Sequence, residues 1–157
     1  MAAVERDLWS CLQHLNSDKA IERKREAERL RSLLKRRDVV ALLDQNSGSR
    51  NGMVSWDVAF NYLERHMQTE IAMLLPGSRT AATASQSRAC SLLNLLRIFL
   101  CAAKQRVNCK TLLHHVTLVL KDSDLWPLLG QQYSFVLLRH VLAHRKYWRS
   151  IAQGNWT

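Results

Sequence analysis

Glycine and proline are scarce in this chain of 157 residues, which contains 5 Gly and 2 Pro. A β-sandwich or barrel turns about every 8–12 residues and needs more of these turn-forming residues. Long hydrophobic runs are also missing. The longest stretch without a charged residue, Leu125–Leu138, has 14 residues, whereas a membrane-spanning helix needs about 18 or more. The first residues mix acids and bases and carry no apolar signal-peptide core. We therefore expect a helical protein with no membrane segment and no secretion signal.

Metal-binding and redox patterns are absent from the cysteine and histidine positions. The four cysteines form no CxxC pair, so the spacing excludes zinc ribbons and thiol redox motifs. Cys90 and Cys101 are about three helical turns apart, and we expect both to face the core as small apolar residues. His140 and His144 have a helical spacing that can bind zinc, but no third ligand is evident. Solvated histidines are the favoured interpretation, and no metal site is predicted.

Apolar residues recur at helical spacing along most of the chain, and 47% of the residues are hydrophobic. Ser55 is a good N-cap for the third long helix, and residues 76–87, rich in Ala, Ser, Thr and Gly, are expected to form a mobile loop. The pattern predicts an all-α fold of about six to seven helices, as an irregular array or solenoid or as a closed bundle. The expected helices are Val4–Leu15, Lys19–Arg36, Trp56–Leu75, Ser85–Lys104, Asn108–Lys121 and Gln131–His144, a last one beginning near Lys146, and a short apolar piece at Val39–Leu43.

The last residues of the chain are apolar at helical spacing, including Tyr147, Trp148, Ile151 and Trp156. A terminal repeat of a solenoid normally carries a polar cap. Residues 1–157 are therefore expected to be one helical region within a longer chain.

The second helix concentrates the positive charge of the chain. Lys19–Arg37 contains nine Lys or Arg and three Glu, a net charge of +6, whereas the whole chain carries +10. Four of its residues follow one another in steps of four, with one glutamate beside them, and the opposite side carries Ala and Leu suited to burial. Such a ridge suits docking on another protein, where Arg and Glu can pair in fixed geometry. The residues of the ridge are Ile21, Arg25, Glu28, Arg29 and Leu33.

This ridge resembles the TAN motif at the N-terminus of ATM/Tel-type serine/threonine kinases, which belong to the phosphatidylinositol-3-kinase-related family. The matching order and spacing continue over most of the chain, whereas residues 76–131 match mainly in helical character. Besides Ala20–Glu26, the matching residues are Leu43, Asp44, Trp56, Asp57, Phe60, Leu63, Arg145, Lys146, Tyr147, Trp148, Ile151 and Trp156.

The resemblance implies the start of an α-solenoid of HEAT-like repeats in a nuclear kinase. In that family the N-terminal solenoid helps to recruit the kinase to DNA double-strand breaks and telomeres through the Mre11–Rad50–Nbs complex. The TAN motif is implicated in telomere-length maintenance and the DNA-damage response. Carried over by position, the partner-binding residues are Ile21, Arg25, Glu28, Arg29 and Leu33, and adjacent helical repeats are further expected contacts.

Catalytic residues are not predicted in this chain. A protein kinase needs a phosphate-covering Gly-rich loop, a catalytic Asp, and an Asn and Asp on Mg²⁺, and none of these motifs occurs in the sequence. The resemblance therefore implies that ATP and Mg²⁺ bind in a kinase domain outside these residues. The chain itself is expected to need no cofactor.

Direct nucleic-acid binding is the alternative for the basic helix. The runs Arg23–Arg25 and Lys35–Arg37 supply clustered positive charge for phosphate contacts. The three glutamates form i+3 and i+4 pairs typical of a solvated helix face, and no aromatic residue is available to stack on bases. Protein docking is the leading interpretation, with a solvated face and weak phosphate contact both left open.

Overall fold

The described part of the chain consists of α-helices and the short segments that join them. The computed structural model describes residues 3–15, 17–47, 53–72, 79–108, 112, 114 and 129–153. The all-α class is confirmed, and within these residues no helix combines the length and hydrophobicity needed to cross a membrane. Within these residues the helices are α1 (Ala3–His14), α2 (Ala20–Leu34), α3 (Arg37–Gln45), α4 (Trp56–Ala72), α5 (Arg79–Ala103), α7 (Leu129–Ala143) and α8 (Arg145–Ala152).

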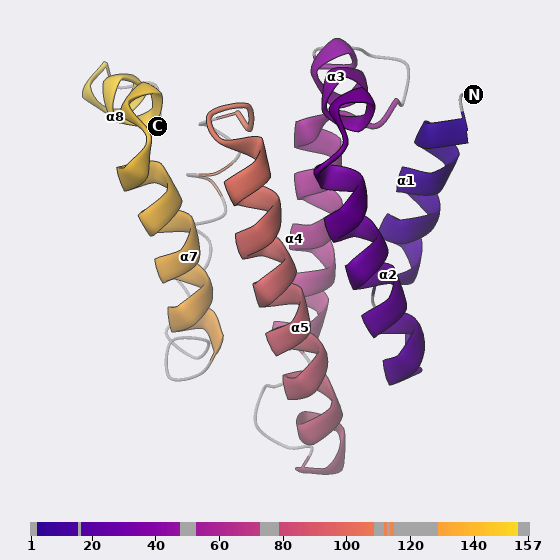
Figure 1. Cartoon of the computed structure of the whole chain (residues 1–157). Helices are drawn as coiled ribbons and strands as arrows, with labels where there is room; N and C mark the ends of the chain where they lie inside the picture. Colours follow the sequence, from indigo (N-terminus) through magenta and orange to yellow (C-terminus); the bar gives the residue numbers. More distant parts are fainter. Residues whose placement is uncertain are drawn as a thin grey trace.

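The helices lie side by side in a row (Figure 1), with α1 and α2 at one end and α7 and α8 at the other. α5 occupies the middle of the row and contacts α2, α4 and α7. Most contacts join helices that are near one another in sequence, as in an array of helical repeats. The HEAT-like solenoid itself remains a prediction.

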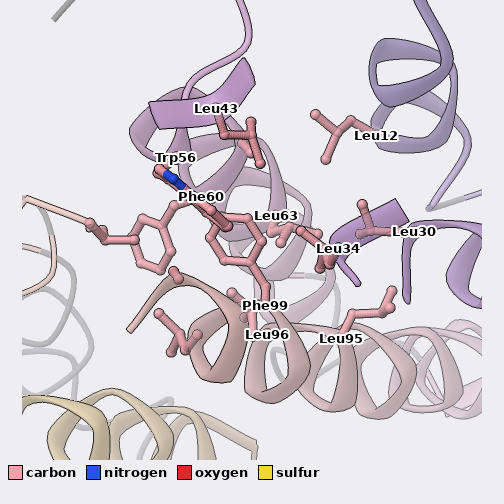
Figure 2. Packing of buried hydrophobic residues seen from close by; sticks show 14 of the residues in the cluster. Leu12, Leu30, Leu34, Leu43, Trp56, Phe60, Leu63, Leu95, Leu96 and Phe99 are labelled. Carbon is pink, nitrogen blue, oxygen red and sulfur yellow. The ribbon is translucent and has the colours of Figure 1, made fainter. Parts of the chain in front are cut away.

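The hydrophobic core lies where α2, α4 and α5 meet (Figure 2). The Trp56 and Phe99 rings, from α4 and α5, have centroids 5.6 Å apart. The Trp56 indole N–H donates to the carboxylate of Asp44 at 2.7 Å, which satisfies its polar atom at the edge of the core. Leucines from three helices complete this cluster: Leu30 and Leu34 of α2, Leu63 of α4, and Leu95 and Leu96 of α5.

The helix boundaries follow local capping and backbone geometry. The predicted helix over Lys19–Arg36 ends earlier, because the backbone is extended at Arg36 (φ −84°, ψ 134°) and the short apolar piece belongs to a separate helix, α3. The Ser55 N-cap is confirmed, since the backbone N–H of Val58 donates to Ser55 Oγ at 3.2 Å.

The loop predicted for residues 76–87 is wrong over 79–87, which form the beginning of α5. After Gly77 this segment contains no further Gly or Pro, and alanine is the best helix former. Residues 76–78 lie outside the described residues, and so does most of the predicted helix Asn108–Lys121.

The expected burial of Cys90 and Cys101 is also wrong, because both residues are exposed. Their spacing of about three turns does place them on one face of α5, but that face is turned away from the core residues Leu92, Leu96 and Phe99. The interpretation of both histidines as solvated is wrong for His140, which is buried, and the His140 and His144 rings lie with centroids 4.6 Å apart. No group of three or more potential metal ligands occurs in the described ranges.

Candidate partner-binding surface on helix α2

Helix α2 is held by its neighbours on one side, and this fixes which residues face solvent. It contacts α1, α3 and α5. Its buried residues are Glu26, Leu30, Leu33 and Leu34, which follow steps of three and four and so form one stripe.

Ser17 forms two hydrogen bonds with side chains of the first turn of α2. The Ser17 hydroxyl donates to Glu22 Oε2 at 2.6 Å, and Arg23 donates to the Ser17 carbonyl at 2.7 Å. The hydrogen bond from Ser17 holds the pKa of the Glu22 carboxyl below its usual value. Ser17 is one of the cap-type residues that precede this helix in the sequence. The N-cap position itself is occupied by Lys19, whose side chain makes no capping bond.

Three of the five predicted partner-binding residues lie together on the surface of α2. Ile21 is 83% exposed, the highest value among the large exposed hydrophobic residues of the described chain. Arg25 and Glu28 are exposed beside it, and Arg25 Nε lies 3.6 Å from Glu26 Oε1. We refer to Ile21, Arg25 and Glu28 as the Ile21 patch. It presents an aliphatic group next to charges of both signs.

The other two predicted residues, Arg29 and Leu33, stabilise the packing of α2. Arg29 Nη2 lies 2.7 Å from Asp7 Oδ1 of α1, and Arg29 Nη1 lies 3.6 Å from Glu26 Oε2. Leu33 is 5% exposed and belongs to the hydrophobic core. The structure therefore does not bring all five residues to one surface.

The geometry of the helix explains this division. Each residue turns an α-helix by about 100°, so a step of four residues overshoots one turn by about 40°. Three such steps, from Ile21 to Leu33, rotate the side chain by about 120° around the axis. The ridge that is continuous in sequence therefore begins on the solvent side and ends in the core.

Glu26 is buried between α2 and α1, although its pairing pattern in the sequence predicted a solvated position. Its i+3 pair with Arg29 was predicted and is present, but its exposed fraction is only 5%. Burial, together with a hydrogen bond to Glu26, raises the pKa of the Cys11 thiol to about 12. The sequence contains a signal for this burial. Glu26 lies four residues before Leu30 and seven before Leu33, so it falls on the same stripe of the helix as these buried leucines.

The cations of Lys19–Arg37 fall into two groups. In the first group, each cation contacts a carboxylate or a carbonyl oxygen. Arg23, Arg25 and Arg29 do so as described above. In addition, Lys19 Nζ lies 4.0 Å from Glu22 Oε1, and Arg36 Nε donates to Asp38 Oδ1 at 3.0 Å. Four further side chains are exposed and make no ion pair within the part of the chain that the structure describes. These are Lys24, Arg31, Lys35 and Arg37.

Most of the described helical array, α2 included, corresponds to one known family. A family model described as TAN, telomere-length maintenance and DNA damage repair, matches residues 8–157. The chain belongs to the TAN family.

A relative of this TAN-family chain is a protein kinase of the pig, Sus scrofa. The chain is 32% identical to the protein named serine-protein kinase ATM over 164 residues. The alignment covers 99% of this chain and 5% of the pig protein, so the chain spans a small part of that relative's length. No solved structure matches the chain.

Proposed function

We propose that this TAN-family chain is the non-catalytic N-terminal helical scaffold of an ATM-like serine/threonine kinase of the nucleus. The family description and the pig relative support a role in telomere maintenance and DNA repair. Kinase activity, with its ATP and Mg²⁺, would belong to a domain outside these residues. The chain would contribute contacts to proteins and to adjacent helical repeats of the kinase.

The surface that acts in this proposal is the Ile21 patch. The observation that carries it is the 83% exposure of Ile21 on a helix whose opposite side is fixed in the core. An aliphatic side chain flanked by Arg25 and Glu28 suits a protein partner that buries the apolar group and pairs with both charges. The proposed partner is the Mre11–Rad50–Nbs complex, which would recruit the kinase to double-strand breaks and telomeres.

Direct nucleic-acid binding remains the alternative function, and the exposed cations of α2 and the residues after it are the observation in its favour. Five of the nine Lys and Arg residues in Lys19–Arg37 already contact a carboxylate or a carbonyl oxygen. The other four are available for phosphates, and Glu28 lies exposed among them. Protein contact therefore accounts for the mixed charge of the patch better than phosphate contact does.

The test is recruitment of the full-length protein carrying Ile21→Asp and Arg25→Glu. We expect fewer protein foci at induced breaks and weaker co-precipitation of the Mre11–Rad50–Nbs complex. Lys35→Glu is the matched control, because it changes an exposed cation directly after α2 and outside the patch. Thermal unfolding of the 157-residue chain would establish that the variants fold. Normal foci and normal co-precipitation by the folded double variant would overturn the assignment.

The alternative is tested with the isolated chain and a labelled DNA duplex. A phosphate-binding module loses affinity steeply as salt rises, in proportion to the phosphates it contacts. We expect no tight duplex binding at physiological salt. Tight, salt-dependent binding that Lys24→Ala and Arg37→Ala weaken for all sequences alike would favour the nucleic-acid function.

A further inference from the structure

A second surface of α2 faces α5 and forms a groove of about 310 Å³. This volume is near the lower end of the range for ligand sites, so the groove can hold a few side chains of a ligand. The groove lies on a different side of α2 from the Ile21 patch, and none of the three patch residues lines it. Its lining residues are Ala20, Arg23, Lys24, Ala27, Arg31, Ser91, Asn94, Leu95 and Ile98.

The charge of the groove has one sign. Three cations from α2 line it, and no carboxylate of the described residues does. The three glutamates of α2 are placed elsewhere: Glu26 is buried against α1, Glu22 is bonded to Ser17, and Glu28 lies in the Ile21 patch. The residues that line the groove therefore include cations and no acidic side chain.

The groove combines cations and apolar side chains, and α5 also contributes the polar residues Ser91 and Asn94. Arg23 and Lys24 lie about 10–12 Å from Arg31 along the helix axis, because an α-helix rises about 1.5 Å per residue. Ala27 lies midway between them on α2. It is partly buried, and Leu95 and Ile98 of α5 line the same groove.

We propose that this groove binds an extended acidic segment of a partner protein, with the pattern acidic, any residue, apolar, any residue, acidic. In an extended chain, residues i, i+2 and i+4 point to one side, and i and i+4 are about 13 Å apart. Two carboxylates at that spacing meet the cations on either side of Ala27, and the apolar residue between them meets Ala27, Leu95 and Ile98. The inference deepens the proposed function, on which it rests, by assigning a partner chemistry to a second surface.

A nucleic-acid strand fits the same groove less well. Its backbone carries phosphates at every step, whereas Ala27, Leu95 and Ile98 make part of the groove apolar. Proteins that bind single strands also stack bases on aromatic side chains, and no aromatic residue lines this groove. The peptide would contact both the cations and the apolar side chains of Ala27, Leu95 and Ile98.

The test measures binding of a fluorescent peptide, Glu-Ala-Leu-Ala-Glu flanked by glycines, to the 157-residue chain by anisotropy. The paired probe replaces both glutamates by glutamines, and a DNA duplex is measured under the same conditions. The variant Lys24→Glu with Arg31→Glu should weaken binding of the acidic peptide at least about tenfold, because like charges then face each other. The matched control, Lys35→Glu with Arg37→Glu, changes the same number of exposed charges just after α2, outside both the groove and the Ile21 patch, and should leave the affinity within about twofold.

Three outcomes would overturn the inference: equal binding of the glutamine peptide, undiminished binding by the folded groove variant, or tighter binding of the duplex than of the peptide through Lys24 and Arg31. Circular dichroism of each variant identifies any that fails to fold. If the groove variant does not fold, the milder Lys24→Gln with Arg31→Gln makes the same comparison. Failure of this peptide experiment is distinguishable from failure of the proposed function, which is measured by recruitment through the Ile21 patch.

Discussion

The guanidinium group of Arg29 lies 2.7 Å from the carboxylate of Asp7, and this ion pair joins α2 to α1. Arg29 also lies 3.6 Å from the buried carboxylate of Glu26. Arg25, one step of four residues earlier, also lies 3.6 Å from a Glu26 oxygen, but its side chain is 66% exposed against 39% for Arg29. Two arginines of one motif thus have different physical roles, and the difference leads to a stability prediction.

Arg29→Ala should lower the free energy of unfolding by about 1–2 kcal/mol. The Asp7 pair is partly exposed and contributes little because solvent screens it, but Glu26 would lose a cation beside a buried carboxylate. Arg25→Ala should cost less than about 0.5 kcal/mol, as for other exposed sites. Urea unfolding of the 157-residue chain followed by circular dichroism measures both. A larger loss for Arg25→Ala would mean that Arg25, and not Arg29, holds the adjacent helices together.

Leu33→Ala should destabilise the chain by about 2–5 kcal/mol, because it removes a buried side chain and leaves a cavity. Ile21→Ala, an aliphatic truncation on the same helix, should change stability by less than about 0.5 kcal/mol. The pair is compared by thermal or urea unfolding. Similar losses for the two variants would contradict the 5% and 83% exposures on which the division of the motif rests.

Cys11 should resist alkylation while Cys90 and Cys101 react. Burial, with the hydrogen bond to Glu26, raises the pKa of the Cys11 thiol to about 12, and only the thiolate is nucleophilic. Cys90 and Cys101 are exposed. Brief iodoacetamide treatment at pH 8 followed by peptide mass spectrometry should label these two and spare Cys11. Labelling in urea is the control, because all thiols should then react; rapid labelling of Cys11 in the folded chain would contradict its placement.

The stability of the chain should fall as the pH falls from about 6.5 towards 4. Burial, and then the neighbouring His144, lowers the pKa of His140 from 6.5 to about 4. The unfolded chain then binds more protons in this window, so the contribution is complete above pH 6.5 and is lost on acidification. At about 1.36 kcal/mol per pH unit it amounts to about 3 kcal/mol at most.

His140→Phe should flatten this pH dependence, which urea unfolding at pH 7, 6, 5 and 4 can measure. His14→Asn is the control, because His14 is exposed on α1 and its ring Nδ1–H donates to the Ser10 carbonyl at 2.7 Å. An unchanged slope in His140→Phe would show that other groups, chiefly carboxylates, cause the acid sensitivity.

The helical pattern was readable in the sequence because apolar side chains at steps of three and four need a common buried face. The N-cap role of Ser55 could be predicted because a serine hydroxyl can accept a hydrogen bond from the first free N–H groups of a helix. The beginning of α5 was not, since alanine and serine occur in loops as well as in helices.

By itself, the sequence determined the all-α class, most helix positions and the concentration of positive charge on α2. These follow from local spacing, caps and charge, which act within a few residues. The tertiary structure alone decided which side of each helix is buried. It placed Leu33 and Glu26 inside, Ile21 outside, and Cys90 on the exposed side of α5. The physical reason is that spacing sets only the angles between side chains around an axis, whereas burial depends on which neighbouring helix covers which angle.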